Sequence, residues 1–527
     1  MKLRLALLGA LSAVFLIPVA ALAADAPHGK ATTEKAGDEK IIAKTDDDKP
    51  LENPVEDAQP RKRSIPFRGK TLAYTVTPGT LVIRNDDGEP IATMFYTAYT
   101  IDPAKGGTPR PLTFLFNGGP GSASMFLHLA SYGPLKLDLS KVEVARPGPY
   151  PLKPNPDTLL DKTDLVFLDA VTTGLSRPAG KATGKDFWGV DQDINAFVRG
   201  IQRYLSIYNR WQSPKFLLGE SYGTMRAGGL VYALQEHGVE MTGVIVMSTV
   251  FTYGPAMDPG TDQIYVSYLP SYAAVAAYHN RLAQKPTDLA AFIQQVRDFA
   301  NGPYLLALQK GNDLSDSERA SLAQQLSAFT SLSAQYLLDN DLRVDPSRFR
   351  KELLRSERRT IGRLDARFTA IDVDAGGEEP EYDAADAAFS AAFIASINDY
   401  LFNDLGYKSD LAYRPSSGFM IGDKWDFTHK MAWLGRVNVA VSTMPDLSRA
   451  IRKNPHLRVM DLNGYYDLAT PFGGAEYDLK RIMLDKSEKD HIQYRYYPSG
   501  HMIYINPVAA HQIQVDLDEF YDNALQE

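Results

Sequence analysis

The sequence predicts an α/β protein with a mixed, mostly parallel sheet and a helical segment inserted between its strands. Short apolar runs recur along the chain and are separated by helical stretches, as a parallel sheet covered on both faces requires. The strand pattern fades over residues 253–413 and resumes at Arg458. A chain of 527 residues is long enough for one large α/β domain with such an insertion.

The composition is that of a globular protein, with 44% hydrophobic and 23% charged residues. A net charge of -8 argues against a nucleic-acid partner held by a basic surface. The chain has no Cys, which excludes disulfides, thiolate metal sites and Cys nucleophiles. Core packing must therefore supply the stability.

Residues 1–23 have the pattern of a secretory signal peptide. Lys2 and Arg4 precede an apolar run over 5–17, and the segment ends in Ala21-Leu22-Ala23, an A-x-A-like cleavage site. The apolar run is short of the about 20 residues that a spanning helix needs. We expect export to the periplasm or the medium, with no stable membrane insertion after cleavage.

Residues 24–66 are rich in Lys, Asp, Glu, Ala and Pro, which predicts a flexible charged leader. The basic triplet Arg61-Lys62-Arg63 is interpreted as an exposed charge cluster in this linker, and a processing site is the alternative.

The core is predicted over 67–252 and 414–527. It opens with an antiparallel meander over 71–77, 80–84 and 92–100, because the turn residues 85–88 join the last two runs. A helix is expected over 191–208. Buried strands are expected over 112–116, 165–168, 216–218, 244–247, 458–462 and 493–497.

The inserted segment, 253–413, is predicted to be a helical cap. Helical patterns cover 288–299, 315–331, 347–357 and 384–400, and such insertions are candidate lids over an active site. Acidic residues gather between Asp372 and Asp386. Their spacing does not match an EF-hand calcium loop, so a solvated acidic loop is predicted.

Gly219-Glu220-Ser221-Tyr222-Gly223 fits G-x-S-x-G between a predicted strand and a helical stretch over 224–236. The small residues at both ends allow a sharp turn that exposes the Ser oxygen, and the helix N-terminus favours negative charge beside it. Ser221 is therefore a candidate nucleophile. The alternative is a glycine-rich turn with an incidental Ser.

A Ser nucleophile needs a His base oriented by a carboxylate. Asp467 follows the strand over 458–462, and His501 lies in a Gly-flanked turn after the strand over 493–497, which gives the order Ser, Asp, His. His491 precedes the last strand and so lies at its wrong end.

An oxyanion hole needs two backbone N–H groups. The amide of Tyr222 is one candidate. The loop Asn117-Gly118-Gly119-Pro120-Gly121 is the source of the second, because glycines let backbone approach a substrate closely.

Together these residues resemble the serine carboxypeptidase family, peptidase family S10, which has an α/β-hydrolase fold. The resemblance implies Ser221 as nucleophile, His501 as general base and then acid, and Asp467 as its orienting group. It also implies the amides of Gly119 and Tyr222 as the oxyanion hole. It rests on residues 117–121, 133–134, 168–169, 174–176, 219–223, 464 with 467, and 500–502.

In this family an Asn and two Glu side chains hold the terminal carboxylate of the substrate. Asn117 and Glu220 match two of these positions, but the third is Ser131. Paired acids share a proton and so accept a carboxylate. Without that partner Glu220 is expected to stay protonated less readily, which predicts an activity optimum nearer neutral pH. Arg226 either holds the carboxylate or pairs with an acid elsewhere.

The resemblance implies a secreted serine carboxypeptidase that removes C-terminal residues of peptides through an acyl-enzyme. An aminopeptidase, an esterase or an acyltransferase is the alternative, since the fold hosts many acyl transfers. A non-catalytic binding protein is disfavoured by the intact set of Ser221, Asp467 and His501. Peptides are the expected partners, and no metal or organic cofactor is implied.

Overall fold

The computed structural model describes residues 49–102, 107–139, 147–254, 260–431, 436–438 and 441–526. The predicted signal peptide lies outside the described residues. In the described part of the chain, no helix combines the length and apolar character needed to cross a membrane.

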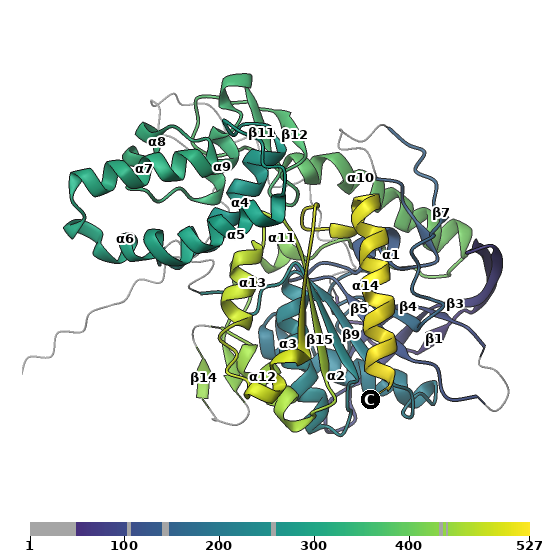
Figure 1. The fold of residues 1–527 in the computed structure, drawn as a ribbon. Helices are drawn as coiled ribbons and strands as arrows, with labels where there is room; N and C mark the ends of the chain where they lie inside the picture. Colours follow the sequence, from purple (N-terminus) through teal and green to yellow (C-terminus); the bar gives the residue numbers. More distant parts are fainter. Residues whose placement is uncertain are drawn as a thin grey trace, which may run out of the picture.

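A ten-stranded sheet forms the centre of the molecule (Figure 1), in the order β1-β3-β4-β8-β5-β9-β10-β15-β16, with β2 paired to β3. The strands from β8 to β16 are parallel, and β4 joins them antiparallel through β8. The bounds are β1 (Asp57–Ala58), β2 (Arg61–Phe67), β3 (Lys70–Arg84), β4 (Pro90–Thr100), β5 (Leu112–Phe116), β8 (Asp164–Leu168), β9 (Lys215–Glu220), β10 (Gly243–Met247), β15 (Arg458–Gly464) and β16 (Ile492–Tyr497).

Alternate side chains of the parallel strands enter two apolar cores, one on each face. In β10, Val244 and Val246 pack with α2 (Val190–Ile207), α3 (Tyr222–Glu236) and α12 (Met444–Lys453). Ile245 and Met247 pack on the other face with α1 (Met125–Ala130), α10 (Ala384–Asn398) and α14 (Pro507–Gln526). The predicted fold class, an α/β-hydrolase fold with a mixed, mostly parallel sheet, is confirmed.

The predicted leader is wrong over its last residues. Arg61-Lys62-Arg63 opens β2, which pairs antiparallel with β3 from Arg61↔Val76 to Phe67↔Lys70. Ile65 and Phe67 are buried on this edge strand, while Lys62 forms an exposed ion pair with Asp102 at 2.8 Å. The period-two alternation of a strand was hidden by the charges on its outer face.

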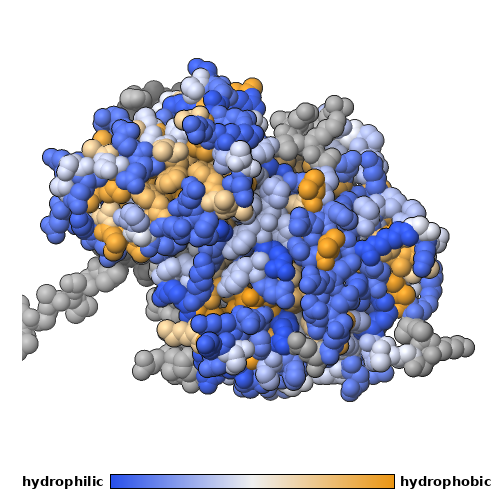
Figure 2. Space-filling model, in the orientation of Figure 1, coloured by the Kyte–Doolittle hydropathy of each residue, from blue (hydrophilic) through white to orange (hydrophobic). Residues whose placement is uncertain are grey.

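Residues 263–354 form a lobe of helices beside the sheet, which we call the helical lobe (Figure 1). Its apolar core extends to Tyr466, Leu468 and Phe472, which follow β15. On the face shown in Figure 2, apolar surface gathers over this lobe. Its helices are α4 (Gln263–Tyr278), α5 (Leu289–Phe299), α6 (Leu305–Lys310), α7 (Asp316–Thr330), α8 (Ala334–Asp339) and α9 (Pro346–Glu352).

Side-chain caps fix several helix starts close to the predicted ones. Asp288, Ser315 and Asp383 each accept a hydrogen bond from a backbone N–H in the first turn of α5, α7 and α10, which satisfies groups that a helix start leaves unpaired. Two strands that the sequence did not predict, β11 (Arg359–Ile361) and β12 (Thr369–Ile371), pair between α9 and α10.

The smaller elements complete the fold. They are β6 (Leu135–Lys136), β7 (Lys153–Pro154), α11 (Gly418–Ile421), β13 (His429–Met431), β14 (Arg436–Asn438) and α13 (Phe472–Leu479).

The prediction of a solvated acidic loop is wrong for Asp372. Its side chain is buried and forms an ion pair of 2.6 Å with Lys351, which is also buried. A buried charge requires such a partner. In the described ranges, no group of three or more His, Asp or Glu side chains is arranged to hold a metal ion.

His429 is buried between two carboxylates, with Nδ1 2.5 Å from Asp191 Oδ1 and Nε2 2.5 Å from Asp446 Oδ2. Burial disfavours the charged ring, but the hydrogen bonds and charges of Asp191 and Asp446 outweigh it and raise the pKa of His429 to about 9. The imidazolium thus joins α2, β13 and α12.

We expect His429→Gln to lower the free energy of unfolding by about 2–3 kcal/mol at neutral pH. The folded-state pKa is raised, so this stability is fully present below the unfolded pKa of about 6.5 and is lost as pH rises through about 9. Urea unfolding of both proteins at several pH values measures the difference. If the difference in free energy of unfolding between the two proteins grew as pH rises from neutral to about 9, this account would be contradicted.

Candidate active site

Ser221 lies on a sharp turn between β9 and α3. Its backbone has φ 60° and ψ -131°, a strained conformation for a residue with a side chain. A Cβ on Gly219 would lie 2.1 Å from the carbonyl oxygen of Gly223, and one on Gly223 would lie 2.8 Å from the carbonyl oxygen of Phe116. Both glycines of the motif are therefore needed for the turn to close.

The glycine-rich loop after β5 packs directly on this turn. A Cβ on Gly118 would lie 2.5 Å from the amide nitrogens of Tyr222 and Gly223. Gly119 has φ 104°, which favours glycine. Within the described ranges, neither the Gly119 N–H nor the Tyr222 N–H donates to a protein acceptor. Two backbone donors are thus available beside Ser221.

His501 and Asp467 are paired after the last two strands of the sheet. His501 Nδ1 lies 2.7 Å from Asp467 Oδ2 and 3.1 Å from Thr470 Oγ1. Asp467 Oδ1 accepts from the N–H groups of Ala469 and Thr470 at 2.7 and 2.9 Å. Burial disfavours the imidazolium, but the charge and hydrogen bond of Asp467 outweigh it and raise the pKa of His501. The pairing leaves Nε2 as the free nitrogen.

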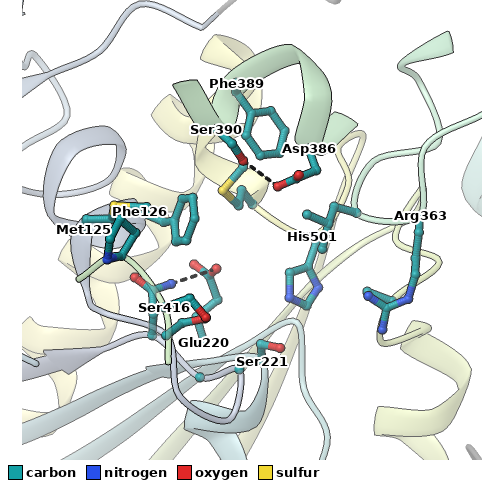
Figure 3. Close-up of a pocket in the computed structure, with 18 of the residues that line it drawn as sticks. Met125, Phe126, Glu220, Ser221, Arg363, Asp386, Phe389, Ser390, Ser416 and His501 are labelled. Atoms are coloured by element: carbon teal, nitrogen blue, oxygen red, sulfur yellow. Dashed lines mark hydrogen bonds between the residues drawn. The ribbon is translucent and has the colours of Figure 1, made fainter. Parts of the chain in front are cut away.

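Ser221, His501, Asn117 and Glu220 line one cavity of about 510 Å³. In Figure 3 the His501 ring is directed toward Ser221, and Glu220 lies on the other side of Ser221. Gly119 lines it too, so the cavity brings five of the seven predicted site residues together.

Asn117 and Glu220 form a buried pair at one side of this cavity. Asn117 Nδ2 donates to Glu220 Oε1 at 3.0 Å, while Asn117 Oδ1 accepts from Leu127 N–H at 3.0 Å. Glu220 Oε2 is buried and, in the part of the chain that the structure describes, accepts no hydrogen bond. Burial raises the pKa of the Glu220 carboxyl to about 7. Burial therefore favours the protonated carboxyl of Glu220 even though Ser131 supplies no partner acid.

Ser131 does not enter the cavity. It ends α1, and its Oγ donates to Leu127 O within the same helix turn. Asn155 Nδ2 donates to Ser131 O at 2.7 Å. The Ser131 position therefore supplies neither an acid nor another polar group to the cavity.

Arg226 points away from the cavity and pairs with an acid, as one of the two alternatives predicted. It is fully buried, with Nε 2.7 Å from Asp193 Oδ2, and its NH1 donates to the backbone carbonyl of Asn117 at 2.7 Å. Its guanidinium also lies 4.3 Å from the centre of the Phe197 ring. Arg226 supports the Asn117 loop from behind.

Sequence reasoning missed the segment 363–367, which braces both loops of the His501–Asp467 pair. Leu364 O accepts from His501 N–H at 2.6 Å, and Arg363 O accepts from Leu468 N–H at 3.0 Å. Asp365 Oδ2 accepts from Gly500 N–H at 3.2 Å. A Cβ on Gly500 would lie 2.4 Å from the Asp365 Cβ, so this glycine is needed for the contact. Gly500 was the only local signal.

Other cavity residues that the sequence did not identify come from the inserted region and from the core segments before and after it. They add an apolar wall, hydroxyls and two charges, and they are Met125, Phe126, Tyr253, Arg363, Asp386, Phe389, Ser390, Ile394, Ser416 and Met502.

A mostly parallel sheet with Ser221 on a strand-to-helix turn defines the chain as an α/β hydrolase. The chain belongs to the serine carboxypeptidase family, whose model matches residues 84–361, more than half of its length. This range contains the Asn117 loop and the Ser221 turn.

Two matches to Kex1 of Saccharomyces cerevisiae, one in sequence and one in structure, agree with this assignment. The pheromone-processing carboxypeptidase KEX1 of Saccharomyces cerevisiae is 30% identical over 135 residues, which are 24% of this chain and 17% of the length of that relative. The crystal structure of Kex1Δp, a prohormone-processing carboxypeptidase from the same yeast, superposes with a TM-score of 0.51 at 15% identity. It covers 85% of this chain and 91% of that one, which supports the fold.

Proposed function

We propose that the protein is a serine carboxypeptidase that removes C-terminal residues from peptides through an acyl-enzyme. One observation carries the proposal. Ser221 and His501, which is paired with Asp467, line the same cavity as Asn117 and Glu220, so a nucleophile and a site for a terminal carboxylate lie side by side.

In the first half of the reaction, Ser221 Oγ attacks the scissile carbonyl carbon while His501 Nε2 takes its proton. Asp467 holds the Nδ1–H and stabilises the imidazolium. The N–H groups of Gly119 and Tyr222 receive the negative charge that develops on the carbonyl oxygen. His501 then gives its proton to the leaving amine as the C–N bond breaks.

In the second half, a water molecule replaces the departed amino acid. His501 Nε2 takes a proton from this water as it attacks the ester carbonyl, and it returns the proton to Ser221 Oγ as the ester bond breaks. No group outside the chain and the water is needed for either half to balance.

The Asn117–Glu220 pair selects the substrate's end. A protonated Glu220 donates a hydrogen bond to the terminal carboxylate, and Asn117 Nδ2 is the second donor. An ionised Glu220 repels the same carboxylate. Recognition of the C-terminal carboxylate therefore depends on the proton of the buried Glu220 carboxyl.

This dependence predicts two different pH profiles. With a blocked dipeptide acid, kcat/KM should fall as pH rises through the Glu220 pKa of about 7, because the ionised side chain repels the substrate. With the matching ester, which has no terminal carboxylate, the fall should be absent. Both substrates should lose activity in acid, since His501 must be neutral to act as a base.

The measurement is kcat/KM against pH for the acid and the ester, repeated with Glu220→Gln. The variant cannot ionise, so its profile with the acid should lose the alkaline fall. The same alkaline fall with the ester, or an unchanged alkaline fall in Glu220→Gln, would contradict the role of Glu220, and an optimum below about pH 5 for the dipeptide acid would contradict the predicted near-neutral optimum.

We also propose that residues 1–23 direct export. The charged start, the apolar run and the A-x-A-like end of this segment support it. N-terminal sequencing of the mature protein tests it, and a mature chain that still begins at Met1 would contradict it.

A further inference from the structure

Arg363 is the one Lys or Arg side chain among the described residues that lines the cavity around Ser221. It is exposed, and no carboxylate of the described chain forms an ion pair with its guanidinium. A guanidinium is always charged and presents a planar set of donors that matches a carboxylate. The cavity therefore contains a fixed positive charge that the proposed chemistry does not use.

The backbone of Arg363 is held at a constant place beside the reacting groups. Its N–H donates to both carboxylate oxygens of Asp383 at 3.1 Å, and its carbonyl accepts from Leu468 N–H at 3.0 Å. The next carbonyl, that of Leu364, accepts from His501 N–H at 2.6 Å. Although Arg363 belongs to the inserted region, its segment is hydrogen-bonded to the loops of Asp467 and His501.

Arg363 lies across the cavity from the predicted carboxylate site. In Figure 3, Glu220 is on one side of Ser221, and His501 and Arg363 are on the other. A peptide whose end is held at Asn117 and Glu220 therefore directs its acyl part toward Arg363. The residue that precedes the scissile bond is the nearest part of the substrate to this charge.

Asp386 is the opposing charge in the cavity. It is exposed on α10, and its Oδ1 accepts a hydrogen bond from Ser390 Oγ. Its charge disfavours an anionic side chain, so removing it should strengthen the effect of Arg363 on such a substrate.

We propose that Arg363 is a specificity-determining residue that favours peptides with Asp or Glu as the penultimate residue. The inference rests on the proposed carboxypeptidase function, which assigns the two ends of the cavity. An acidic side chain there would accept two parallel hydrogen bonds from the guanidinium. For a partly exposed pair we expect a preference of about tenfold in kcat/KM over the isosteric amide.

The test uses three blocked dipeptide acids that share the same C-terminal residue and carry Glu, Gln or Lys before it. Wild type should rank them Glu, Gln, Lys, with a Glu-to-Gln ratio of kcat/KM of about ten. Arg363→Gln should bring this ratio close to one, and Arg363→Lys should keep part of it. Asp386→Asn should raise the ratio above that of wild type.

Arg358 offers a matched control, because it is exposed and does not line the cavity. Arg358→Gln should leave the Glu-to-Gln ratio unchanged. The inference is overturned if wild type shows no Glu preference, or if Arg363→Gln retains it.

The two proposals fail in distinguishable ways. If wild type hydrolyses all three acids at equal rates, only the specificity inference fails. If wild type cleaves none of them but cleaves the matching ester, the carboxypeptidase proposal fails, and the inference fails with it.

Discussion

Replacing Ser221 with Ala should lower kcat for a blocked dipeptide acid by about a millionfold. The proposed mechanism passes through an ester on Ser221 Oγ, so a chain without this oxygen cannot form the intermediate. The remaining oxyanion donors and binding groups should leave only a residual rate.

The Ser221 result is interpretable because the fold should survive. Ala can adopt the same strained φ of 60° at about the same cost as Ser, since both carry a Cβ. Thermal unfolding of the variant should match that of wild type. A folded variant with kcat within about tenfold of wild type would show that another group is the nucleophile.

Asp467→Asn should lower kcat by about ten thousandfold with little change in KM. Asp467 Oδ1 accepts two backbone N–H groups, whereas Oδ2 accepts from His501 Nδ1–H and Thr470 Oγ1. An Asn would keep its oxygen toward the backbone donors and turn its NH2 toward His501. The ring would then carry its proton on Nε2, where it cannot accept the Ser221 proton.

Asp461 provides the matched control for this change. It is a buried carboxylate on β15, the strand that precedes Asp467, and it accepts hydrogen bonds from Thr249 and Asn463 without lining the cavity. Asp461→Asn should affect stability rather than kcat. If Asp467→Asn reduced kcat no more than Asp461→Asn does, the orienting role of Asp467 would be wrong.

The strands and the turns that follow them could be predicted because their signals are local. Residues 112–116 are a run of apolar and β-branched residues and form β5 with the same bounds. Gly219 and Gly223 indicate the Ser221 turn in the sequence, because neither position has space for a Cβ. Such signals lie within a few residues of the feature that they predict.

Features that depend on contacts between distant segments left no local pattern. The charges of Arg61, Lys62 and Arg63 concealed an edge strand that becomes evident only when β3 is beside it. Asp365 contacts Gly500 across 135 positions of sequence. The raised pKa of Glu220 comes from burial, which depends on the packing of the whole cavity.

The most direct test of the account is the selectivity of the wild-type protein among three forms of one blocked dipeptide: the free acid, the C-terminal amide and the methyl ester. We predict release of the C-terminal residue from the acid with a kcat/KM at least about tenfold above that for cleavage of the same peptide bond in the amide. Ser221→Ala should abolish cleavage of all three. If the amide or the ester were cleaved as well as the acid or better, the Asn117–Glu220 pair would not recognise a terminal carboxylate. The chain would then be a serine hydrolase that does not select its substrates by a free C-terminal carboxylate.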